Sequence, residues 1–271
     1  MRGEFVDVLG CRIYYYAAGS RGVGEPVVLL HGFPTSSRLW HAVVRDFPPG
    51  HRLVVCDLPG FGRSDPPREF SVGSWARDVV GLLDELRISR ACLVGHGLGG
   101  AIAERVQRDA PSRVTHLALL SAPAFGVAPR RLARLARVLL PLAEHAPPGF
   151  LAGLVQGSVL SGFADRERSR LTIDTCLQPF TTIAGRRLLA SHLRALQLAE
   201  SAAADAGSTG SRVPTAILWG GADPFYPPSL GERLRDSIPG ATLEIIPGAA
   251  HFTPEDAPER VIATLSALLS R

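Results

Sequence analysis

Two residues near the end of the chain, Asp223 and His251, are of the types that carry out general acid–base chemistry. Each follows a short apolar run that predicts a strand, Thr215 to Trp219 before the aspartate and Thr242 to Ile246 before the histidine. A carboxylate that accepts the Nδ1 proton of an imidazole leaves Nε2 free to take a proton from a substrate. The pair therefore predicts a general base.

A third segment, Cys92 to Gly100, lies between a buried strand pattern and a helix pattern. Enzymes with a covalent intermediate commonly present a serine from such a strand–turn–helix segment, in the pattern G-x-S-x-G. Here the central position is Gly97, which has no side chain, whereas covalent catalysis needs a nucleophile. Because glycine adopts positive φ without strain, we expect the turn to be kept while attack by a serine hydroxyl is lost.

Together with four further segments, the turn around Gly97 resembles the α/β-hydrolase family, with its epoxide hydrolase, haloalkane dehalogenase and esterase members. These segments are His31-Gly32-Phe33-Pro34, Asp57-Leu58-Pro59-Gly60-Phe61-Gly62-Arg63-Ser64, Trp219-Gly220-Gly221-Ala222-Asp223 and Gly248-Ala249-Ala250-His251. The resemblance implies a mostly parallel, eight-stranded, doubly wound α/β sheet with an inserted helical lid. It also implies an oxyanion hole beside Gly32, formed by the backbone N–H groups of Phe33 and Leu98.

Apolar runs alternate with helical patterns in the first half of the chain, which favours a parallel sheet covered by helices. Strands are predicted at Val27 to Leu30, Leu53 to Cys56, Ala91 to Val94 and Leu117 to Leu120, after a hairpin at Phe5 to Leu9 and Arg12 to Ala17. Helices are predicted at Ser37 to Phe47, Ser74 to Leu86, Leu98 to Asp109 and Pro258 to Leu269.

Between these strands and the last two, the chain shows only helical periodicity. We therefore expect a hydrolase-type core at 1–123 and 211–271 and a helical lid, or cap, at 124–210. The segment Gly207 to Ser211, rich in glycine and serine, predicts a flexible return linker.

Several residues beside these motifs are candidates for the wall of a substrate pocket: His96, Trp40, Phe125 and Tyr226. Two others, His31 and Asp57, are better interpreted as residues that stabilise their turns. Ser121 ends a strand at the same edge, but no base accompanies it in the sequence.

Composition excludes several classes of function. Every one of the 29 basic residues is an arginine, and the helical group Arg130, Arg131, Arg134 and Arg137 is best explained as a solvated face rather than a nucleic-acid or membrane surface. The four cysteines lack metal-ligand spacing, so neither a metal nor another cofactor is expected. No apolar run is long enough for a membrane span and no secretory signal is present, so we expect a cytoplasmic protein.

These expectations combine into one hypothesis of function. A cofactor-independent enzyme would use His251, Asp223 and the oxyanion hole on an apolar, carbonyl-bearing small molecule, in carbon–carbon bond formation, Michael-type addition, cyclisation or lyase chemistry. The arginine-only composition suggests a GC-rich bacterium, which favours a tailoring step in natural-product biosynthesis. Two alternatives stay open: a ligand-binding protein without turnover, and a serine hydrolase inactivated by a Ser-to-Gly change at position 97. The oligomeric state is open too, with a homodimer as one option.

Overall fold

The computed structural model describes residues 3–19, 24–125, 127, 138, 140–142, 146–147, 149–202 and 213–271. Within these residues eight strands form one sheet, in the order β1-β2-β4-β3-β5-β6-β7-β8. The strands are β1 (Glu4–Val8), β2 (Cys11–Gly19), β3 (Val27–Leu30), β4 (Arg52–Cys56), β5 (Ala91–His96), β6 (Val114–Leu120), β7 (Thr215–Gly220) and β8 (Thr242–Ile246). The opening hairpin pairs antiparallel and every other pair except β2–β4 is parallel, so the predicted mostly parallel, eight-stranded sheet is confirmed.

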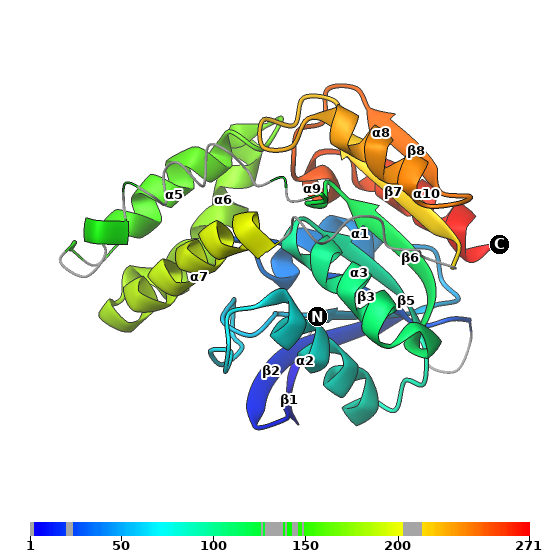
Figure 1. The fold of residues 1–271 in the computed structure, drawn as a ribbon, viewed down its shortest axis with the longest axis horizontal. Coiled ribbons are helices and arrows are strands. Elements are labelled where there is room, and N and C mark those ends of the chain that lie inside the picture. The colour runs from blue at the N-terminus through cyan, green and yellow to red at the C-terminus, as the bar shows by residue number, and fades with distance from the viewer. Residues whose placement is uncertain are drawn as a thin grey trace.

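Helices cover both faces of the sheet, as continuous burial of the central strands requires. They are α1 (His41–Asp46), α2 (Val72–Glu85), α3 (Leu98–Asp109), α8 (Pro228–Ser237), α9 (Thr253–Asp256) and α10 (Pro258–Leu269). In Figure 1, α2 and α3 lie in front of the sheet, whereas α1 and α10 lie behind it. The bounds of α3 and α10 match the prediction, and α2 begins two residues early because the Ser71 hydroxyl caps it by accepting from Ser74 N–H.

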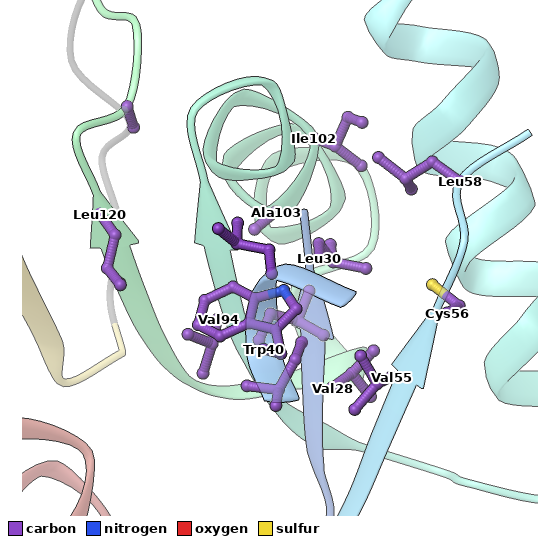
Figure 2. Close-up of a cluster of buried hydrophobic side chains, with 14 of the residues drawn as sticks. Val28, Leu30, Trp40, Val55, Cys56, Leu58, Val94, Ile102, Ala103 and Leu120 are labelled. Atoms are coloured by element: carbon purple, nitrogen blue, oxygen red, sulfur yellow. The ribbon is translucent and has the colours of Figure 1, made fainter. Parts of the chain in front are cut away.

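The core fills the space between the central strands and these helices. All four residues of β3 are fully buried, and so is the indole of Trp40, at the end of the short 3₁₀ helix Ser37–Trp40. Figure 2 shows Trp40 within a cluster of aliphatic side chains that includes Val28, Leu30 and Val94. Burial of apolar side chains along the strands therefore stabilises the sheet, and the polar candidate residues lie in the loops that follow the strands.

Between β6 and β7 the described residues form helices and no strand. They are α5 (Phe150–Leu160), α6 (Arg166–Leu177) and α7 (Ile183–Ala202), with short 3₁₀ turns, and they extend to one side of the sheet in Figure 1. This arrangement fits the expected helical insertion, while the boundaries at 124 and 210 stay a prediction. The arginine group at 130–137 and the linker at 207–211 lie outside the described residues.

No helix in the described part of the chain is long and apolar enough to cross a membrane.

Candidate active site

The predicted site residues follow the carboxyl ends of neighbouring strands. Gly32 and Phe33 follow β3, Gly97 follows β5, and Asp223 follows β7. His251 lies in the turn between β8 and α9. Because carboxyl ends of parallel strands share one edge of the sheet, the topology alone brings these segments together.

The imidazole of His251 and the carboxylate of Asp223 form a buried pair. His251 Nδ1 donates to Asp223 Oδ2 at 2.9 Å, and the two side chains are 6% and 0% exposed. The other carboxylate oxygen accepts from the backbone N–H of Phe225 at 2.8 Å and of Tyr226 at 3.0 Å. Burial acts to raise the pKa of Asp223, but the paired imidazole and the two amide donors outweigh it and hold the pKa below its usual value. An ionised Asp223 therefore fixes the tautomer in which His251 Nε2 is a base.

The turn that carries His251 is held by two further contacts. Asp256 accepts from Ala250 N–H at 2.8 Å and from Ala164 N–H at 3.0 Å, which connects the turn to the segment just before the lid helix α6. The backbone N–H of His251 donates to Gly162 O at 2.8 Å. Contacts from both the lid and the core therefore fix the backbone position of His251. The sequence did not reveal this role of Asp256.

Gly97 occupies the sharp turn between β5 and α3, with φ 52° and ψ −122°. A Cβ placed on Gly97 would lie 3.6 Å from His251 Nε2 and 3.7 Å from Gly32 Cα, with no other atom within 4 Å apart from its chain neighbours. Both are ordinary van der Waals distances. The base therefore points at the space that a side chain at position 97 would enter.

Backbone N–H groups of two residues flank the same space. A Cβ placed on Gly32 would lie 3.3 Å from Leu98 N, so the loop after β3 runs against the start of α3. Among the described residues, no acceptor is bonded to the N–H of Phe33 or of Leu98. Two donors without protein acceptors beside a base are the parts needed to hold a developing oxyanion.

His96 lies directly behind the base. Its Nε2 donates to the carbonyl oxygen of His251 at 3.0 Å, and the two rings are 4.7 Å apart. Burial, with the nearby His251 ring, lowers the pKa of His96 to about 3. The ring therefore stays neutral and positions His251 through its backbone, whereas its Nδ1 is buried without a partner in the described structure.

Of the other residues predicted to line a substrate pocket, Tyr226 lies beside His251, whereas Phe125 and Trp40 make other contacts. The rings of Tyr226 and Phe225 lie 5.6 Å and 5.1 Å from the ring of His251, so they line the base. The ring of Phe125 lies under the guanidinium of Arg233, at 4.6 Å. Trp40 is enclosed in the core, with no ring contact to His251, because its helix turns the indole toward the sheet.

His31 and Asp57 hold the loops at this edge through hydrogen bonds, whereas Ser121 makes none in the described structure. His31 donates from Nδ1 to Gly32 O and accepts at Nε2 from Leu58 N–H, each at 3.0 Å. The carboxylate of Asp57 accepts from the N–H groups of Ser37 and Arg63. The Ser121 hydroxyl is buried and has no partner in the described structure.

A residue of the lid that sequence reasoning did not single out, His192 of α7, packs into the core. Its Nε2 donates to Gly60 O at 2.9 Å, and its ring lies 4.1 Å from Phe61 and 6.1 Å from Phe33. Burial lowers the pKa of His192 to about 4, so a neutral ring makes this contact. Only the long-range packing of α7 on the loop after β4 identifies it.

No cluster of three metal-ligating side chains occurs among the residues that the structure describes.

Comparison with known proteins identifies one family and relatives that match almost the whole chain. The family model described as alpha/beta hydrolase fold matches residues 25–258. An uncharacterized protein of Mycobacterium tuberculosis is 30% identical over 272 residues, which cover 96% of this chain and 78% of that protein. Haloalkane dehalogenase 2 of the same organism is 29% identical over 94% of this chain and 90% of its own length.

Solved structures agree with the topology. An alpha/beta hydrolase fold protein from Burkholderia ambifaria is 28% identical, with a TM-score of 0.82 over 99% of this chain and 97% of that one. The enol-lactonase from Burkholderia xenovorans LB400 has a TM-score of 0.83 at 21% identity, over 99% of this chain and 100% of that one, and shows likeness of fold alone.

Proposed function

Because this chain belongs to the alpha/beta hydrolase fold family, we propose that it keeps the family's base and oxyanion donors but works without a covalent intermediate. His251 is the general base, Asp223 its orienting carboxylate, and the substrate a carbonyl-bearing small molecule. The observation that carries the proposal is the space at Gly97, where the base faces a position without a side chain.

The reaction begins when His251 Nε2 removes a proton from the carbon next to the substrate carbonyl. The electron pair of that C–H bond moves to the carbonyl oxygen, which becomes an enolate oxyanion. The N–H groups of Phe33 and Leu98 donate to this oxygen, and loss of one such donor typically lowers a rate by ~10²–10³. Asp223 stabilises the imidazolium that results.

The enolate carbon can then attack an electrophilic carbon of the same or a second substrate. The imidazolium returns its proton to the product, so the base is regenerated without outside oxidant or cofactor. Addition, cyclisation and the reverse cleavage all fit this sequence. The apolar rings of Phe225 and Tyr226 beside the base favour an apolar substrate, as expected for a natural-product tailoring step.

A second candidate uses the same base on water. The space beside Gly97 adjoins His251 Nε2, so a water seated there would be activated by His251 for direct attack on an ester. Hydrolysis would then proceed without an acyl-enzyme.

The test compares the native chain with His251→Ala and His41→Ala, the latter a control at an exposed histidine that begins α1. Mass spectrometry follows conversion of a panel of ketones, β-keto esters and enones, while p-nitrophenyl esters report hydrolysis. We expect the native chain and His41→Ala to convert carbonyl compounds, and His251→Ala to convert none. Hydrolysis of esters alone would select the second candidate. If a carbonyl compound binds tightly but all three proteins convert it only at the background rate, both candidates are overturned and the chain is a binding protein.

A further inference from the structure

A cavity lies at the edge of the sheet opposite to His251. Its volume is about 600 Å³, and it is lined by residues at the amino ends of four adjacent strands, β3 to β6. The catalytic candidates follow the carboxyl ends of β3 and β5, so the length of the strands separates the two sites. This cavity has no part in the proposed reaction.

Three arginines, Arg52, Arg87 and Arg90, line the cavity. In the described part of the chain none of them forms an ion pair. Their neighbour Arg113 differs, because it pairs with Asp84 at 2.7 Å and donates to the backbone carbonyls of residues 88 and 89. The three guanidiniums are thus left available to a ligand.

The cavity also holds a histidine–carboxylate pair. His116 Nδ1 donates to Glu25 Oε2 at 2.6 Å, and the backbone carbonyl of Glu25 accepts from His51 Nδ1 at 3.0 Å. Among the described residues of the lining, Glu25 is the one carboxylate, against three arginines. These four side chains together carry a surplus of two positive charges.

Arg87, Ser89 and Arg90 are exposed, and they lie close together in the segment that leads into β5. A ligand in the cavity can therefore contact their guanidinium and hydroxyl groups directly. Arg52, which is half-buried, begins β4, and β3 lies between β4 and β5 in the sheet. Charge and exposure therefore both favour an anionic ligand with several oxygens.

We propose that this cavity binds a phosphate monoester. The dianionic phosphoryl group matches the surplus of two charges, and the guanidinium fork matches its oxygens in pairs. The exposed hydroxyl of Ser89, also in the lining, can donate to the same group. The volume is in the range of small-molecule sites, so it also accommodates the organic part of an ester.

Titration calorimetry with inorganic phosphate and with phenyl phosphate tests the proposal, with acetate as a monoanionic comparison. We expect saturable binding of phosphate, tighter binding of phenyl phosphate, and no saturation with acetate. Arg52→Gln and Arg90→Gln should each weaken binding about tenfold or more, the loss of one charge-assisted contact. The matched control Arg45→Gln removes an exposed arginine of α1 that pairs with Asp46, and should bind as the native chain does.

Absence of saturable phosphate binding would overturn the proposal, and so would equal weakening in all three variants. Arg90 is exposed and precedes β5, so its variant folds even if Arg52→Gln does not. Conversion at the His251 site is measured in parallel and should be unchanged in Arg90→Gln. The phosphate site and the proposed reaction can therefore fail independently.

Discussion

Gly97→Ser is the substitution that tests the geometry of the site most sharply. The added Cβ meets only His251 Nε2 and Gly32 Cα, at 3.6 Å and 3.7 Å, so no neighbour must move. The remaining penalty is backbone strain, because φ of 52° with ψ of −122° disfavours any residue with a Cβ. We expect the free energy of unfolding to fall by about 1–3 kcal/mol.

The hydroxyl of the new serine is one bond beyond a Cβ that lies 3.6 Å from the base, and so comes within hydrogen-bonding reach of Nε2. A serine activated in this way attacks esters, and the base contributes ~10²–10⁴ in rate. We expect Gly97→Ser to show a burst of p-nitrophenol with p-nitrophenyl acetate and to be labelled by a fluorophosphonate. The native chain should show neither.

Gly97→Ala is the matched control, since it has the same Cβ and the same strain but no hydroxyl. It should lose stability to the same extent and gain no esterase activity. A folded Gly97→Ser variant that is neither labelled nor active would refute the placement of His251 Nε2 beside residue 97. An equal burst in Gly97→Ser/His251→Ala would refute the role of the base.

Three further outcomes are expected. Asp223→Asn should lower the His251-dependent conversion rate by at least about 100-fold with little change in KM, because the wrong tautomer is favoured; an equal rate contradicts the pairing. His192→Phe keeps a ring but leaves Gly60 O without its donor, so urea unfolding should show a loss of about 1–3 kcal/mol that His192→Gln partly restores. Burial raises the pKa of Glu104 from 4.5 to about 7, so between these pH values the folded state holds a proton that the unfolded state releases. As the pH rises from 4.5 to 7, the free energy of unfolding should therefore fall by about 3 kcal/mol relative to that of Glu104→Gln. The same dependence of the unfolding free energy on pH in both proteins would disprove this.

Elements with strong periodicity were predictable from the sequence. The bounds of α3 match because its apolar face starts directly after the glycine turn. The four central strands were found because burial on both faces leaves continuous apolar runs, although β4, β5 and β6 are one to three residues longer than predicted. The pairing of His251 with Asp223 was also predictable, since both residues lie in turns that follow neighbouring parallel strands at one edge of the sheet.

Contacts between distant segments were not predictable in this way. Trp40 is adjacent in sequence to the loop after β3, but packing of its helix buries the indole in the core. His192 reaches Gly60 across 132 residues, and His116 reaches Glu25 across 91. None of these pairs has a periodic or spacing signal, because each depends on how whole elements pack.

The central claim is that His251 takes a proton directly from the carbon of a carbonyl-bearing substrate. Its most direct measurement is exchange of the α-proton in D₂O, followed by NMR for the compounds that the native chain converts. We predict enzyme-dependent loss of the α-proton signal, absent in His251→Ala, with no covalent adduct in the intact mass of the protein. Conversion without α-proton exchange, together with an acylated protein, would contradict the claim.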